Sequence, residues 1–278
     1  MALFLFALAL HLFLAMGGTI AGIDFKLLII VDEIGAILVA PVLFALLLRL
    51  SFRDAFLLRS THWIHYVVAG ATAIPLQMFG GAMQELVLDT IPGGDDWREQ
   101  LERTLEPLLK TETTGELALL LFGGVLLAAV CEELLFRGLM LQLLARGRGW
   151  AVPIFITGLL FALFHLDIVG LLPRTLLGVY FGILVWRSGS IFPAMLAHGA
   201  NNLLAFAAIP LLEATEGPAP EFAEAGLLAL LSGAAFLAIL TAYLRLTPAA
   251  IWTDRTPPTP PELPPPPTAS NTEPLDDS

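Results

Sequence analysis

Residues 117–141 read LALLLFGGVLLAAVCEELLFRGLML, an apolar run long enough to cross a membrane that carries two acids and one arginine. A charged side chain at the centre of a bilayer costs about 2.5–3.5 kcal/mol even on the lowest scales, so such residues tend to face the protein interior and mark function. On a helix, Glu133 and Arg137 are four residues apart and can pair on one face. Glu132 lies about 100° further round the helix and is free for another role.

The composition of the whole chain indicates a membrane protein. Of its 278 residues, 57% are hydrophobic and only 14% are charged. These values exclude an ordinary soluble domain and predict an all-α fold, a polytopic bundle of membrane helices. The net charge of −11 disfavours nucleic-acid binding. The single cysteine, Cys131, excludes an intramolecular disulfide and a Cys-rich metal site.

Apolar segments divide the chain into about eight expected transmembrane helices. Their ranges are 1–23, 27–50, 64–86, 117–144, 150–166, 170–186, 191–212 and 226–244. A short amphipathic helix is expected on the membrane surface within the acidic segment 89–116. We therefore expect a helical membrane domain at 1–246 with its motif core at 117–212. The Pro-rich tail, 247–278, is expected to be flexible and disordered.

The distribution of Lys and Arg predicts the orientation of these segments. Arginines gather at the ends of the second, fourth, sixth and eighth segments, which places those ends in the cytoplasm. The residues concerned are Arg49, Arg53, Arg59, Arg146, Arg148, Arg187 and Arg245. We expect an integral, multi-pass protein in a lipid bilayer with both termini in the cytoplasm.

Other polar side chains lie at similar depths in the expected membrane helices. His165 ends the fifth segment, and the seventh contains His198 and Asn202 on one helical face. With a rise of about 1.5 Å per residue, their depths overlap that of Glu132. Each alone has a structural explanation, such as an interfacial histidine or a hydrogen bond between helices. Together they are compatible with one site.

These groups suit hydrolysis of an acyl bond. A poorly solvated carboxylate is a stronger general base, an imidazole can help to activate water, and His and Asn can donate hydrogen bonds to an oxyanion. Alternatively, Glu132, His165 and His198 provide one carboxylate and two imidazoles, a ligand set known for catalytic zinc (Zn). The sequence leaves a metal-free mechanism and a zinc mechanism open. It contains neither His-Glu-x-x-His nor Gly-x-Ser-x-Gly.

Three short motifs occur in order on separate expected helices: EELLFR at 132–137, FALFH at 161–165 and HGANN at 198–202. They resemble the motifs of the CAAX-protease and bacteriocin-processing family (CPBP), the type II CAAX prenyl endopeptidases. The resemblance implies an α-helical intramembrane endopeptidase that cleaves a membrane-associated or lipidated peptide or protein. Prenylated CAAX proteins are the substrates of the eukaryotic branch.

The resemblance also implies a role for each motif residue. Glu132 and His165 would activate water, and His198 and Asn202 would stabilise the oxyanion. The acid and arginine that follow in the first motif, Glu133 and Arg137, would be a supporting pair. Members are described both as metalloproteases and as glutamate-dependent enzymes, so the metal stays open.

Two other functions are compatible with the same residues. The chain could be a non-catalytic scaffold of this family, acting in bacteriocin self-immunity or peptide binding. It could also be a proton- or ion-coupled transporter, because Asp32 and Glu33 are intramembrane acids without a place in the motifs. Internal repeats, common in transporters, are not evident. His11 is expected to serve packing.

Overall fold

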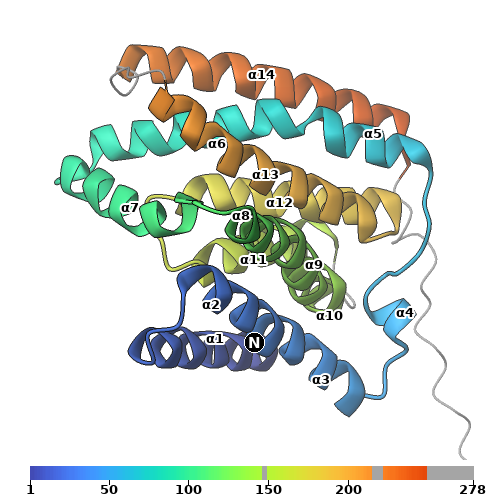
Figure 1. Ribbon diagram of the computed structural model, residues 1–278. Helices are drawn as coiled ribbons and strands as arrows, with labels where there is room; N and C mark the ends of the chain where they lie inside the picture. The colour runs from blue at the N-terminus through green and yellow to red at the C-terminus, as the bar shows by residue number, and fades with distance from the viewer. Residues whose placement is uncertain (146–148, 215–221, 249–278) are drawn as a thin grey trace, which may run out of the picture.

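The computed structural model describes residues 1–145, 149–214 and 222–248, and the regular structure within these ranges is helical (Figure 1). Arg146, Arg148 and the tail from residue 249 lie outside the described residues. The helices are α1 (Ala2–Ile20), α2 (Phe25–Asp32), η1 (Glu33–Leu38), α3 (Val39–Leu47), α4 (Phe52–Ala55), α5 (Trp63–Ala71), α6 (Ala73–Thr90), α7 (Gly94–Leu109), α8 (Thr114–Leu120), η2 (Leu121–Leu127), α9 (Ala128–Glu133), η3 (Leu134–Met140), α10 (Leu141–Ala145), α11 (Ala151–Phe164), α12 (Leu171–Ser188), α13 (Phe192–Ala214) and α14 (Phe222–Leu246), where η denotes a π-helical segment.

Several of these helices join end to end into longer rods. Within the described residues, five segments are long and apolar enough to cross a membrane: Ala2–Ile20, Phe25–Leu47, Trp63–Thr90, Thr114–Ala145 and Phe222–Leu246. The segment α11 is apolar but has only 14 residues. The expected polytopic helical bundle is confirmed. Its eight spans remain a prediction, although each of the eight segments is helical.

The rod Thr114–Ala145 is at the centre of the fold. Its α9 portion contacts η1 on one side and α13 on the other, so it joins the N-terminal and C-terminal helices (Figure 1). A Cβ atom on Gly123 would lie 2.8 Å from the Ile30 side chain, and one on Gly124 would lie 2.8 Å from the Phe206 ring. Because neither glycine has a side chain, the rod packs closely against α2 and α13 at once.

Helices α11 and α12 also pack closely through glycines. A Cβ atom on Gly178 would lie 2.6 Å from the Cα atom of Gly158. The backbones can therefore approach until the carbonyl of Gly178 accepts a hydrogen bond from Arg137 on η3, at 2.9 Å. Three helices meet at this point.

The amphipathic segment expected at the membrane surface forms the helix α7. Its first turn contains acids, which suit the positive end of the helix dipole. Arg98 on α7 forms ion pairs of 3.0 Å with Glu85 and 3.2 Å with Asp89, both on α6. These contacts hold α7 against the end of α6, where Leu105 lines a cavity described below.

Candidate active site

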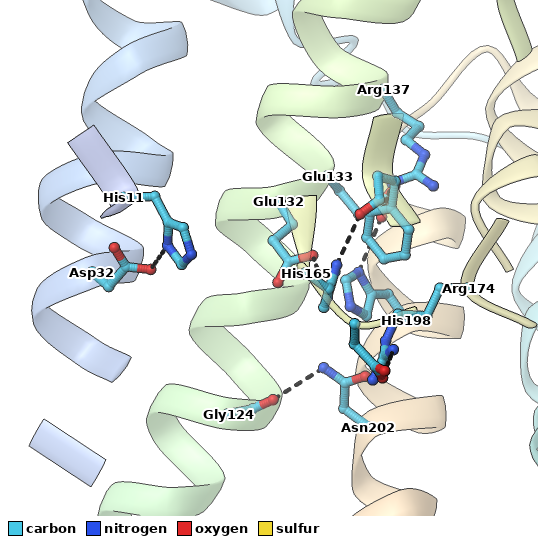
Figure 2. A network of polar contacts seen from close by, with 12 residues as sticks. His11, Asp32, Gly124, Glu132, Glu133, Arg137, His165, Arg174, His198 and Asn202 are labelled. Carbon is cyan, nitrogen blue, oxygen red and sulfur yellow. Dashed lines mark hydrogen bonds and ion pairs between the residues drawn. The ribbon is translucent and has the colours of Figure 1, made fainter. Parts of the chain in front are cut away.

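The two acids of the central motif are the last residues of α9. Glu132 is 7% exposed and Glu133 is fully buried. The segments on either side of α9, η2 and η3, are π-helical, and π-helical turns often occur at functional sites. Although adjacent in sequence, the two carboxylates have different partners (Figure 2).

Glu133 forms the ion pair that its spacing from Arg137 predicts. Its Oε1 atom accepts a hydrogen bond from Nη1 of Arg137 at 2.8 Å. The same oxygen lies 3.0 Å from Nδ1 of His198 on α13. An ionised carboxylate can only accept, so Nδ1 of His198 is the donor. Glu133 therefore orients His198, the first residue of the third motif, and also contacts Arg137.

Aromatic rings enclose this network. The Arg137 guanidinium carbon lies 4.6 Å from the ring centre of Phe161 and 5.2 Å from that of Phe181. The His198 ring stacks on Phe181 at 5.1 Å and meets the edge of Phe161 at 5.6 Å. The rings exclude water from the ion pair and hold the imidazole of His198 in one orientation.

Glu132 faces the second motif. Its Oε2 atom lies 3.8 Å from Nε2 of His165, too far for a direct hydrogen bond. Nδ1 of His165 lies 2.8 Å from the carbonyl oxygen of Phe161 and donates to it. In the neutral ring, Nε2 then presents a lone pair on the side of Glu132.

Asn202 is held by the central rod. Its Nδ2 atom donates to the carbonyl oxygen of Gly124 at 3.0 Å, which uses one of its two N–H groups (Figure 2). The close approach of α13 at Gly124 makes this contact possible. The side chain is thus fixed on the same face of α13 as His198.

A cavity of about 380 Å³ joins these residues. His165, His198 and Asn202 line it, together with residues of α6, α7 and α12. Glu132 does not line the cavity but lies behind His165. The structure brings three of the four predicted catalytic side chains to one cavity wall, and Glu132 lies 3.8 Å from one of them, His165.

Comparison with known families matches residues 114–204 to the family described as type II CAAX prenyl endopeptidase Rce1-like. The match includes all three motifs. This segment belongs to the type II CAAX prenyl endopeptidases. No curated protein and no solved structure gives a significant match to the chain. The family predicted from the motifs is confirmed for this segment, which is about one third of the chain.

Polar residues that the sequence did not single out also line the cavity of this CAAX-protease segment. Asn201 is 7% exposed, and its Oδ1 atom has no hydrogen-bond partner among the described residues. Gln77 and Gln84 of α6 reach the cavity from outside the family match. Gln77 and Gln84 are seven residues apart, about two helical turns, and this spacing in the sequence indicates that they share one face of α6.

Three polar residues of the N-terminal helices lie outside the matched segment. His11 packs against the Phe164 ring at 4.8 Å, as expected, and its Nδ1 atom also lies 2.7 Å from Oδ2 of Asp32. Glu33, the next residue, is buried beside Glu132. These contacts place the N-terminal acids next to the CAAX-protease motif.

The predicted zinc ligands are not arranged as a metal site. Within the described residues, no group of three or more His, Cys, Asp or Glu side chains could hold a metal ion. Glu132 and His165 face each other, but Nδ1 of His198 is bonded to Glu133. The steps proposed below therefore use no metal, and zinc dependence is a separate test.

Proposed function

We propose that this protein is an intramembrane endopeptidase in which Glu132 and His165 activate water to hydrolyse a peptide bond of a membrane-associated or lipidated protein. The observation that supports this proposal is the 3.8 Å separation between Glu132 Oε2 and His165 Nε2 at the wall of a cavity. A water placed off the line between these atoms can contact both.

In the first step, this water donates one hydrogen bond to Glu132 and attacks the substrate carbonyl carbon. The carboxylate takes the proton as the new C–O bond forms. His165 orients the water, because its Nδ1 atom is tied to the Phe161 carbonyl and its ring is fixed. When the C–N bond breaks, Glu132 returns the proton to the leaving amine.

The oxyanion faces His198 and Asn202. The second N–H of the Asn202 amide remains available, since the Gly124 carbonyl accepts only one. His198 donates through Nε2 when its ring is an imidazolium, because Glu133 already accepts from Nδ1. The buried Glu133 carboxylate stabilises that imidazolium, much as the carboxylate of a hydrolase triad does.

The cavity suits a peptide with an apolar portion. Its walls include Leu76, Leu105 and Phe206, whereas Gln77 and Gln84 offer hydrogen bonds to a peptide backbone. The family acts on prenylated substrates at the membrane, and we propose the same substrate class here. We also propose that both termini are cytoplasmic, as the arginine distribution predicts.

The proposal is tested with the purified chain in liposomes. Two synthetic peptides of identical sequence, one farnesylated at a cysteine near its C-terminus and one not, are followed by mass spectrometry. We expect cleavage of the farnesylated peptide by the wild type and none by Glu132→Gln. Cleavage of both peptides at equal rates would support the peptidase activity but contradict recognition of the prenyl group. Equal cleavage by Glu132→Gln would reject the mechanism.

A further inference from the structure

The cavity at the proposed active site has one permanently charged side chain in its wall. Among the described residues that line it there is no Asp, Glu or Lys, and Arg174, near the start of α12, is the one arginine. His165, His198 and Asn202 line the same cavity (Figure 2). The steps proposed above do not use Arg174, so its positive charge at this position has another explanation.

The loop between α11 and α12 holds this guanidinium in place. Nη1 of Arg174 donates a hydrogen bond to Oδ2 of Asp167. Oδ1 of Asp167 in turn accepts from the backbone N–H of Val169 at 2.9 Å, which fixes the carboxylate. A Cβ atom on Gly170 would lie 1.6 Å from Nη1 of Arg174, so the absence of a side chain there makes room for the guanidinium. The local sequence thus fixes Arg174 at the cavity wall.

Most of the N–H groups of Arg174 remain available. Its bond to Asp167 uses Nη1, and neither Nη2 nor Nε donates a hydrogen bond to any described residue. These two nitrogens lie along one edge of the planar guanidinium, and that edge matches the two oxygens of a carboxylate. The side chain is 28% exposed and lines the cavity, so a molecule bound there can contact it.

The surroundings of Arg174 favour a ligand with a carboxylate. Apolar side chains such as Leu177 and Phe206 make up much of the cavity wall. A cation in such surroundings is poorly hydrated, and a carboxylate that accepts two hydrogen bonds from it replaces the lost water contacts. An ion pair that served only to hold the loop would need Nη1 alone, and would leave the other edge of the guanidinium unused.

We propose that Arg174 binds a carboxylate of the peptide substrate through Nη2 and Nε, while Asp167 holds Nη1. The C-terminus of the peptide or an acidic side chain can supply this group. Arg174 and three of the proposed catalytic side chains line one cavity of about 380 Å³, so the carboxylate lies close to the cleaved bond. The inference rests on the proposed function and deepens it, because the protein then selects substrates by a negative charge near that bond.

Three farnesylated peptides of otherwise identical sequence test the proposal in liposomes. One ends in a free carboxylate, one in a carboxamide, and one in a carboxamide with Asp as its last residue. We expect amidation to lower kcat/KM of the wild type roughly tenfold or more, the effect of losing hydrogen bonds to a charged group. Recovery with the terminal Asp would identify an acidic side chain as a source of the carboxylate, and no recovery would identify the C-terminus alone. Equal kcat/KM for all three peptides would overturn the proposal.

Variants assign this preference to Arg174. Asp167→Asn/Arg174→Gln leaves no unpaired charge and should cleave the acid and the amide at equal rates. Arg174→Lys keeps the ion pair if the double variant does not fold, and should reduce the preference severalfold because an ammonium lacks the bidentate edge. Arg103→Gln is the matched control, since Arg103 pairs with Glu99 and does not line the cavity. A wild-type preference in either folded Arg174 variant would overturn the proposal.

A binding measurement separates this inference from the proposed function. Fluorescently labelled acid and amide peptides are titrated against Glu132→Gln in liposomes, with protein-free liposomes as the baseline, so no turnover is needed. We expect the acid to bind roughly tenfold more tightly, and the difference to vanish when Asp167→Asn/Arg174→Gln is added. This result without any cleavage by the wild type would reject the proposed function alone. Cleavage by the wild type with equal binding and equal rates for the two peptides would reject the role of Arg174 alone.

Discussion

Glu133 contacts His198 directly, with Oε1 of the acid 3.0 Å from Nδ1 of the imidazole. The spacing of Glu133 and Arg137 predicted only a local ion pair on one helix. The structure extends that pair to α13, so the acid connects the first motif to the third. A residue expected to serve as support therefore also holds the proton of His198 on Nδ1, the nitrogen that faces it.

Replacement of Glu133 by glutamine tests this control. The amide keeps the size of the side chain but removes the charge that stabilises an imidazolium at His198. If His198 donates to the oxyanion, kcat should fall by roughly 10²-fold, the cost of losing one oxyanion donor, with KM little changed. The measurement is steady-state cleavage in liposomes, beside a melting curve to confirm folding. A folded variant with kcat within twofold of the wild type would contradict the role.

Replacement of Arg137 by methionine tests the buried ion pair. The guanidinium is fully buried, so its loss leaves the Glu133 charge and the Gly178 carbonyl without their donor. Removal of one partner of a buried pair costs about 3–5 kcal/mol, which should appear as unfolding at lower SDS fraction in mixed micelles. The double variant Glu133→Gln/Arg137→Met should recover part of this loss, because no unpaired charge remains. No recovery would show that the pair is not coupled.

The contact between α11 and α12 is tested by Gly178→Ala. The added Cβ atom would lie 2.6 Å from the Gly158 Cα atom, so the helices must move apart. We expect a loss of about 1–3 kcal/mol in stability, the usual cost of overpacking. Gly70→Ala is the matched control, because a Cβ atom there meets nothing within 4 Å. A stability change no larger than that of the control would contradict the packing described here.

Zinc dependence is tested directly on the purified enzyme. The proposed mechanism uses no metal, so prolonged treatment with a chelator should leave the cleavage rate unchanged, and metal analysis should find less than one zinc per chain. Loss of activity on chelation with recovery on added Zn²⁺ would contradict a metal-free mechanism. That result would require His198 to turn from Glu133 toward the other two side chains.

Much of this architecture could be predicted from the sequence because bilayers impose simple rules. Long apolar runs form membrane helices, and acidic side chains, which cost free energy to place within a bilayer, mark a functional site. The pairing of Glu133 with Arg137 follows from helical geometry alone. The family motifs then supplied roles for residues on three helices.

Contacts between distant helices could not be predicted in this way. Nothing in the spacing of Asp32 and Glu33 reveals that η1, which follows α2, packs against α9, since that depends on the close packing of α2 at Gly123. At Gly199, on the face of α13 that meets Ala129, a Cβ atom would make only ordinary contact at 3.5 Å. The position of the Asn202 side chain depends instead on Gly124 of η2, whose carbonyl oxygen accepts its hydrogen bond.

The central claim is that Glu132 and His165 together activate the attacking water. Its most direct test is single-turnover cleavage of the farnesylated peptide in liposomes by the wild type, Glu132→Gln, His165→Ala and the double variant, each checked for folding. Because both residues act on one water, we predict that either single variant loses activity almost as completely as the double variant, by roughly 10²-fold or more. Wild-type cleavage by a folded Glu132→Gln or His165→Ala protein would contradict the claim.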